Sequence, residues 1–150
     1  MSVTRRARPE DAPRLAEIAT AAYSIYLPRM PQGVRPRPMT ADYAAHVRDD
    51  EVWVADDEGE IRGFLVLVPR GDHLLLDNVA VDPSGQGRGI GAALLMLAED
   101  RARALNLPEI RLFTHVVMVE NQARYERLGY RETGRARAGD LDRVHYSKLL

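Results

Sequence analysis

The chain has 150 residues, of which 45% are hydrophobic and 29% are charged, and it contains no cysteine. This length and composition suit one compact domain over residues 1–150 with a hydrophobic core. A net charge of -1 argues against nucleic-acid binding driven by bulk electrostatics. The absence of cysteine excludes both a disulfide framework and a thiolate nucleophile. No apolar run reaches the roughly 20 residues of a membrane span, and no apolar core follows the basic N-terminus, so we expect a soluble, cytoplasmic protein.

The first third of the chain predicts a strand followed by two helices. We expect the strand at residues 3–8 and the first helix from Pro9, because apolar residues then recur at helical spacing. Residues 27–38 hold four prolines and a glycine, which predicts a segment without regular structure. Thr40 is expected to cap a second, short helix that ends near Asp49.

Strands dominate the middle of the chain. Residues 52–56 and 61–69 predict a hairpin around a turn at residues 57–60. A further strand is expected to run from residue 73 or 74 to residue 81. Residues 64–68 (Phe-Leu-Val-Leu-Val) are apolar at consecutive positions, as expected when both faces of a sheet are covered. The sequence therefore predicts helices on each side of the sheet.

A glycine-dense turn joins this strand to an amphipathic helix. Residues 82–91 read Asp-Pro-Ser-Gly-Gln-Gly-Arg-Gly-Ile-Gly, with glycine at four alternate positions. Such a turn lets successive backbone N–H groups face one centre, and the helix behind it adds its positive N-terminal end. The segment predicts a site for an anion, with a pyrophosphate as the natural ligand.

Spacing separates three kinds of phosphate-binding loop. The Walker loop is excluded because no Gly-Lys-Ser/Thr closes the turn. Residues 87–92 fit the dinucleotide pattern G-x-G-x-x-A, but the strand after the helix, residues 110–114, ends without the acidic residue that this pattern requires. Residues 86–91 match the coenzyme A loop, Gln/Arg-x-x-Gly-x-Gly/Ala, at every fixed position.

The last third of the chain predicts a helix, a strand, a short helix and two strands. The helix after the glycine loop keeps its apolar spacing until Asn106. A strand at residues 110–115 follows, then a short helix that contains Tyr125. The final strands are expected near residues 130–137 and 143–148.

A second motif stands in that short helix. Residues 120–130 (Glu-Asn-Gln-Ala-Arg-Tyr-Glu-Arg-Leu-Gly-Tyr) combine an asparagine near the helix start, a tyrosine and a Leu-Gly-Tyr. With the coenzyme A loop before it, the chain resembles the GNAT superfamily of N-acetyltransferases over nearly all of its length. In many members a further helical turn separates the asparagine from the tyrosine, whereas Asn121 and Tyr125 are four residues apart here.

The resemblance implies a fold. It is an α+β (three-layer α/β) domain with a mixed, mostly antiparallel sheet of six or seven strands. Helices are expected on both faces of this sheet. The cofactor is expected where two central strands splay apart.

The resemblance also implies a reaction. We expect transfer of an acetyl group from acetyl-CoA to a primary amine of a small molecule, by direct attack in a ternary complex. Protein N-termini or lysines are the alternative acceptors, and a non-catalytic acyl-CoA-binding or sensing domain is the alternative class. The expected partners are acetyl-CoA and an amine acceptor, without nucleic acid or membrane. The sequence leaves open whether the protein forms a homodimer. No metal is expected, because the four histidines lack the spacing of a zinc site.

The resemblance assigns the cofactor contacts residue by residue. The backbone of Val79, Ala80 and Val81 is expected to pair with the pantetheine arm, with the Val79 N–H aimed at the thioester oxygen. Arg88 is expected to add a charge-assisted contact to the pyrophosphate. Asn121 is either a pantetheine contact or the N-cap of its helix. The loop residues that would offer amides to the pyrophosphate are Gln86, Gly87, Arg88, Gly89, Ile90 and Gly91.

Two residues are the catalytic candidates. Tyr125 is expected to donate its proton to the departing thiolate, and the alternative is a tyrosine that only packs in the core. Asp77 lies among apolar residues on the strand that leads to the site, where a carboxylate would attract an ammonium group and accept its proton. The alternative for Asp77 is a hydrogen bond within the sheet or to a loop. His115 and His145 are the fallback bases.

The resemblance also implies that the proline-rich segment, taken here as residues 26–39, lines the acceptor pocket, because the region between the first two helices does so in this superfamily. Tyr26, together with Tyr23, would line this pocket or merely pack. Arginines in the segment would bind a substrate carboxylate, as suits an amino-acid-like amine, unless they are simply exposed. These arginines are Arg29, Arg35 and Arg37.

Overall fold

The computed structural model describes residues 2–150 and contains seven strands and four α-helices in that range. The strands are β1 (Ser2–Arg6), β2 (Glu51–Asp57), β3 (Glu60–Pro69), β4 (Leu74–Val81), β5 (Glu109–His115), β6 (Arg131–Ala138) and β7 (Leu141–Leu149). The α-helices are α1 (Ala12–Tyr23), α2 (Tyr43–Asp49), α3 (Ile90–Ala104) and α4 (Val119–Arg127). Single 3-10 segments are η1 (Pro9–Asp11), η2 (Ser24–Arg29), η3 (Arg37–Met39) and η4 (Pro83–Gly85).

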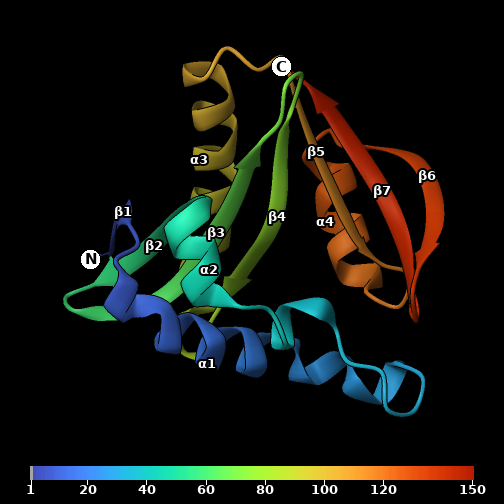
Figure 1. Ribbon diagram of the computed structural model, residues 1–150, viewed down its shortest axis with the longest axis horizontal. Helices are drawn as coiled ribbons and strands as arrows, with labels where there is room; N and C mark the ends of the chain where they lie inside the picture. Colours follow the sequence, from blue (N-terminus) through green and yellow to red (C-terminus); the bar gives the residue numbers. More distant parts are fainter. Residues whose placement is uncertain (1) are drawn as a thin grey trace.

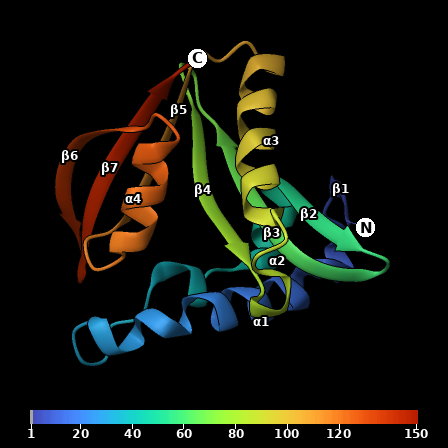
Figure 2. The same cartoon turned by 180° about the vertical axis from the view of Figure 1, so that it is seen from behind.

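The strands form one mixed sheet in the order β1-β2-β3-β4-β5-β7-β6. Every neighbouring pair is antiparallel except β4 and β5, which are parallel. Helices α1 and α2 lie in front of the sheet in Figure 1, and α3 and α4 lie in front when the molecule is turned round in Figure 2. The predicted mixed, mostly antiparallel sheet with helices on both faces is therefore confirmed.

Strand β3 explains why consecutive apolar residues are needed. Phe64 and Val66 belong to the core that α1 and α2 cover, whereas Leu65 and Leu67 belong to the core under α3. All four side chains are fully buried. Because neighbouring strand residues point to opposite faces, a strand covered on both sides cannot alternate apolar with polar positions.

The sheet opens between β4 and β5. Their parallel pairing covers only three residue pairs and ends at Leu76 opposite Leu112. Asp77 follows at once as a β-bulge, since Val66 of β3 pairs with Asn78 and Leu67 pairs with Leu76. Beyond this point β4 stays with β3 and β5 stays with β7, which makes the V that Figure 1 shows. The predicted splay between two central strands is confirmed, and the bulge marks where it begins.

Two local predictions were wrong. The proline-rich segment was expected to lack regular structure, but it contributes to η2 and forms η3. Proline is tolerated there because the first N–H groups of a short 3-10 helix have no hydrogen-bond partner within the helix. Thr40 does not cap the second helix. The carboxylate of Asp42 accepts the Ala45 N–H at 3.0 Å and caps it instead, while the Thr40 hydroxyl donates to the Arg37 carbonyl.

The N-cap interpretation of Asn121 was also wrong. Helix α4 has Met118 at its N-cap, and Asn121 is the third residue of the helix. No helix within residues 2–150 is both long and apolar enough to cross a membrane.

Candidate functional site

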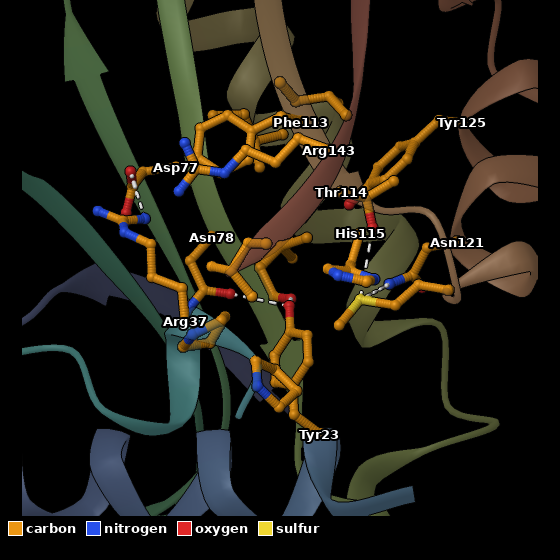
Figure 3. A pocket seen from close by; sticks show the side chains of 17 residues that line it. Tyr23, Arg37, Asp77, Asn78, Phe113, Thr114, His115, Asn121, Tyr125 and Arg143 are labelled. Atoms are coloured by element: carbon orange, nitrogen blue, oxygen red, sulfur yellow. Dashed lines mark hydrogen bonds and ion pairs between the residues drawn. The ribbon is translucent and has the colours of Figure 1, made fainter. Parts of the chain in front are cut away.

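Two hollows lie in the opening of the V, and they share one wall. The first, here called the loop groove, runs past the glycine loop, the end of β4 and helix α4. The second, here called the inner pocket, lies deeper between β4 and β5 (Figure 3). The groove encloses about 1550 Å³ of empty space and the pocket about 570 Å³, open solvent included. Residues that line both are Tyr23, Val79, Asn121 and Tyr125.

The glycine loop presents backbone to the loop groove. Gly87 and Gly89 have φ angles of 80° and 78°, in the left-handed region that favours glycine. A Cβ atom on either residue would meet no other heavy atom within 4 Å, so the space beside them is open. Gly89 is the N-cap of α3, and its carbonyl accepts the first intrahelical bond, from Ala93. The N–H groups of the first turn therefore remain available to an anion.

The cation of this site comes from α4. Arg88, which sequence reasoning placed there, is 56% exposed, pairs with Asp57 at 3.0 Å and does not line the groove. Arg124 lines the groove, and its Nη1 lies 3.9 Å from the position that a Cβ on Gly91 would take. Sequence reasoning missed Arg124. Its helical spacing from Glu120 and Leu128, which line the same groove, is the signal that identifies it.

The edge of β4 beyond the bulge faces the V. The Tyr23 hydroxyl lies 3.1 Å from the Val79 carbonyl and 3.0 Å from Asn78 Oδ1, and it donates to these acceptors. The Val79 carbonyl therefore points away from β3. Since the N–H and C=O of one strand residue point to the same side, the Val79 N–H also faces the opening.

Tyr125 stands in the shared wall. Its side chain is buried, and its ring packs edge-on against Tyr130 at a centroid distance of 5.7 Å. Within residues 2–150, no group hydrogen-bonds its hydroxyl. Burial raises the pKa of Tyr125 to about 12, while the charge of Arg124 acts in the opposite direction. The hydroxyl is therefore protonated at neutral pH and free to donate.

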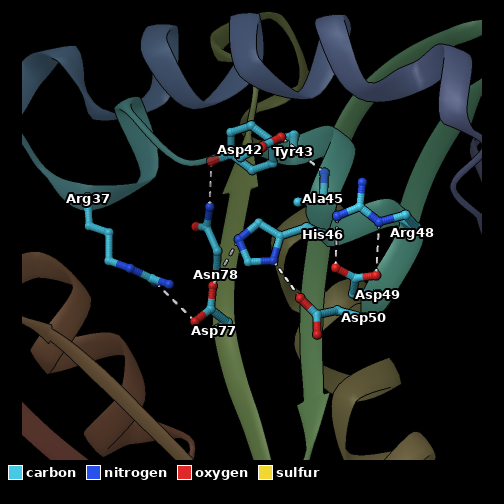
Figure 4. A network of polar contacts seen from close by, with 10 residues as sticks. All are labelled: Arg37, Asp42, Tyr43, Ala45, His46, Arg48, Asp49, Asp50, Asp77 and Asn78. Carbon is cyan, nitrogen blue, oxygen red and sulfur yellow. Dashed lines mark hydrogen bonds and ion pairs between the residues drawn. The ribbon is translucent and has the colours of Figure 1, made fainter.

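Asp77 lines the inner pocket and belongs to a chain of charged groups (Figure 4). Its Oδ1 lies 3.0 Å from Arg37 Nη1, and its Oδ2 lies 3.8 Å from His46 Nε2. On the far side of the ring, His46 Nδ1 lies 2.7 Å from Asp50 Oδ2. The Asp77 side chain is only 6% exposed, so the bulge turns a carboxylate inward and α2 and η3 supply its partners. The alternative prediction for Asp77, a hydrogen bond to a loop, agrees with the bond from Arg37 of η3, although the sequence named neither partner.

A second chain of hydrogen bonds fixes the wall of the pocket. Asn78 Nδ2 donates to the Tyr43 hydroxyl at 3.0 Å, and that hydroxyl donates to the Pro38 carbonyl at 2.6 Å. With Tyr23 donating to its Oδ1, the buried Asn78 amide holds α1, α2 and the proline-rich segment together. Such a satisfied polar network orders the loop that borders the pocket.

The two fallback bases differ in their places, since His115 lines the inner pocket and His145 does not. Both ring nitrogens of His115 lie 3.2 Å from backbone N–H donors, those of Val117 and Asp142. A neutral imidazole accepts at only one nitrogen, so it holds one of these hydrogen bonds at a time, and a second proton would remove that one too. Burial also lowers the pKa of His115. His145 does not line the pocket, and its ring packs against Phe113 instead.

The proline-rich segment reaches the pocket at other residues than expected. Tyr26 lines the loop groove, not the inner pocket. Arg29 lines neither, because it pairs with Glu120 at 2.7 Å and its guanidinium lies over the Tyr26 ring. The segment borders the pocket through Pro36, Arg37 and Pro38.

The pocket also contains residues that the sequence did not single out. Phe113 and Thr114 of β5 and Arg143 of β7 line it. Within residues 2–150, no group of three or more His, Asp or Glu side chains is arranged to hold a metal ion.

Solved structures share this fold along the whole chain. The chain aligns with the PaiA N-acetyltransferase of Thermoplasma acidophilum, solved in complex with coenzyme A, at a TM-score of 0.82 and 18% identity, covering 100% of this chain and 99% of that one. It aligns with the ribosomal-protein-S18-alanine N-acetyltransferase of Escherichia coli at 0.79 and 21%, covering 99% and 94%. The fold is that of the GNAT acetyltransferases.

The sequence comparison gives the family. The model of the acetyltransferase (GNAT) family matches residues 16–130, which is more than half of the chain. The chain belongs to this family.

Curated relatives match over shorter stretches. Mycothiol acetyltransferase of Rhodococcus jostii (strain RHA1) is 38% identical over 79 residues, 51% of this chain and 24% of that protein. N-acetyltransferase family 8 member 3 of Rattus norvegicus is 28% identical over 104 residues, 65% of this chain and 46% of that protein. The aligned part thus spans about a quarter to a half of these relatives.

Proposed function

We propose that this protein binds acetyl-CoA in the loop groove and transfers its acetyl group to the primary amine of a small molecule in the inner pocket. One observation carries this proposal: the two hollows meet at a wall that contains Val79 and Tyr125. A thioester that enters along the groove and an amine held in the pocket would meet there. Family membership and the coenzyme A-bound relative of the same fold support the choice of cofactor.

The groove suits the two ends of the cofactor differently. The free N–H groups at the start of α3, with Arg124 opposite them, suit the pyrophosphate. The open edge of β4 suits the pantetheine arm, which would pair with Val79 and Val81 like an added strand, because the backbone groups of Ala80 between them face β3. The Val79 N–H would then polarise the thioester carbonyl.

Tyr125 assists the leaving group. As the amine nitrogen bonds to the carbonyl carbon and the C–S bond breaks, the Tyr125 hydroxyl donates toward the sulfur. A thiol has an ordinary pKa near 8.5, whereas that of Tyr125 is about 12. The proton is therefore always present on Tyr125. Tyr125 therefore stabilises the developing thiolate mainly by donating a hydrogen bond to it, while the proton stays on the tyrosine. The released thiolate then takes its proton from solvent.

Asp77 acts as the general base that removes the proton of the attacking amine. An α-amine with a pKa near 8 is about one-tenth neutral at pH 7, whereas a lysine amine near 10.4 is neutral about once in 2,500. The Asp77 carboxylate in the pocket would attract the ammonium and accept its proton, directly or through one water. Arg37 and His46 then keep the carboxylate oriented.

The test is the release of free CoA with a panel of amines. The panel contains amino acids, short peptides that offer an N-terminus, and peptides that offer only a lysine. We expect turnover with small α-amines, about 100-fold slower in the Asp77→Asn variant. Asp49→Asn, which changes an exposed carboxylate of α2 that pairs with Arg48, is the matched control and should change the rate little.

Three outcomes would count against parts of this proposal. Acetyl-CoA binding without release of CoA for any amine would favour a non-catalytic sensor. Turnover confined to peptides would move the acceptor to proteins. An unchanged rate in Asp77→Asn would remove the role of this residue as base.

A further inference from the structure

We propose that the amine acceptor carries a carboxylate, and that Arg143, together with Arg37, binds this group over the ring of Phe113. The inference rests on the proposed function, because it names the substrate class of the same pocket. It arises from the charge distribution in the inner pocket.

Two guanidinium groups lie at one aromatic ring. The guanidinium carbon of Arg143 lies 4.2 Å from the Phe113 ring centroid, and that of Arg37 lies 5.9 Å from it. Strand pairing places Arg143 opposite His115, so Arg143 and Phe113 share one face of β5 and β7. All three side chains line the inner pocket, and Figure 3 shows them with Asp77.

The two arginines differ in their partners. Arg37 is engaged by Asp77 at 3.0 Å. Within residues 2–150, Arg143 has neither an ion-pair partner nor a hydrogen-bond acceptor for its guanidinium, although the residue is half-buried. Burial lowers the pKa of Arg143, and the neighbouring charge of Arg37 lowers it further. Arginine nevertheless stays charged, so the pocket holds a partly desolvated cation whose hydrogen-bond donors are unused.

The net charge of the pocket selects among amines. Its lining has two cations, Arg37 and Arg143, and one carboxylate, Asp77. His115 adds no charge at neutral pH, because burial lowers its pKa. A polyamine would bring only positive charge to this positive pocket. A zwitterion matches it, since its ammonium can face Asp77 and its carboxylate can form a charge-assisted pair with Arg143.

The shape of the contact favours a planar anion. The contact of a guanidinium with an aromatic ring uses none of its N–H hydrogen bonds, so these donors remain available to an anion. A carboxylate accepts two such N–H groups side by side. The acceptor that fits these features is an α-amino acid or a short peptide with a free C-terminus.

The experiment compares each acceptor with its own carboxamide. Initial rates of CoA release are measured with pooled α-amino acids, with the same pools as C-terminal amides, and with spermidine. For the unmodified protein we expect kcat/KM at least about tenfold higher for the acids than for the amides. This comparison needs no variant, so a folding defect cannot obscure it.

Variants then assign the effect to Arg143. Arg143→Ala should raise the acceptor KM about 10- to 100-fold for acids and leave the amides and the KM of acetyl-CoA unchanged. Arg143→Lys, which keeps the charge without the planar fork, should fall between the two. Arg131→Ala removes an exposed arginine of the neighbouring strand β6 and is the matched control, with no expected effect.

The outcomes separate this inference from the function on which it rests. Turnover with amides or spermidine at rates equal to or above those of the acids would overturn the carboxylate site while leaving the acetyltransferase intact. An Arg143→Ala variant that keeps the acid-over-amide preference would overturn the role of Arg143. Release of CoA with none of the amines, despite binding of acetyl-CoA, would contradict the proposed function itself and the inference with it.

Discussion

The loop groove and the inner pocket are neighbours built from different parts of the chain. The groove offers backbone from the glycine loop, the first turn of α3 and the edge of β4, and side chains from α4. The pocket offers side chains that come from η3, β4, β5, α4 and β7. Backbone contacts depend on conformation and on the absence of a Cβ, whereas side-chain contacts depend on residue identity. Substitutions in the glycine loop should therefore act through the shape of the chain, whereas those at Arg124 and in the pocket should act through the side chain that is lost.

The largest expected effect is at the glycine loop. Gly89→Val places a β-branched residue at a φ of 78° and puts its side chain where the anion should lie. We expect acetyl-CoA affinity to fall at least about 100-fold, because both strain and obstruction act on the same backbone. Titration calorimetry measures this change.

The matched control for this substitution is Gly33→Val. Gly33 has a φ of 79°, equally open surroundings and no part in either hollow. It should show the same loss of stability, about 1–3 kcal/mol, with unchanged affinity for acetyl-CoA. Equal affinity in both variants would mean that the loop does not hold the cofactor.

The second effect concerns the shared wall. Tyr125→Phe should lower kcat about 100-fold and leave the acetyl-CoA Kd almost unchanged, because the hydroxyl acts only as the C–S bond breaks. Steady-state kinetics and calorimetry together measure the two quantities. An equal loss of kcat and affinity would indicate a packing role.

Tyr130→Phe is the control for that substitution. The Tyr130 hydroxyl is buried and has no hydrogen-bond partner within residues 2–150. Its removal should leave kcat unchanged and stabilise the fold by about 1 kcal/mol, since an unsatisfied buried polar group is lost. Urea denaturation measures the second quantity.

A smaller effect is expected at the charged side of the groove. Arg124→Gln should weaken acetyl-CoA binding about tenfold and reduce its dependence on salt, because one charge-assisted contact to the pyrophosphate is lost. Arg127→Gln, on an exposed position of the same helix, should change neither. Identical salt dependence in Arg124→Gln and the unmodified protein would contradict the assignment.

The smallest expected effect concerns His115, which lines the pocket beside the charged groups and influences how stability depends on pH. The pKa of His115 is lowered in the fold, so the unfolded chain binds more protons below about pH 6.5. Stability should therefore fall as pH drops from 7 toward 5, and His115→Gln should make that slope shallower. His145→Gln is the control, and an unchanged slope in His115→Gln would show that His115 does not contribute.

The sequence predicted what lies in one continuous stretch of chain. Residues 86–91, the strand before them and Tyr125 carry local patterns, because the functions proposed for them depend on backbone turns and helical spacing. Asp77 was found because it interrupts an apolar strand. Its partners Arg37 and His46 were not, since α2 and η3 are brought to it only by tertiary packing.

The same limit explains the remaining differences. Arg143 reaches the pocket through the pairing of β5 with β7, which leaves no mark in the local sequence. Arg88 was predicted because it stands within the loop, but its side chain pairs with Asp57 instead. Tyr26 and Arg29 lie in the expected segment, yet the 3-10 turns direct them to the groove and to Glu120.

A crystal structure with acetyl-CoA bound tests the central claim most directly. The account predicts the pyrophosphate against the backbone of residues 86–91 and Arg124, the thioester oxygen near the Val79 N–H, and the sulfur within hydrogen-bonding reach of the Tyr125 hydroxyl. Acetyl-CoA bound away from the loop, or with its thioester outside the wall that joins the groove to the inner pocket, would contradict it.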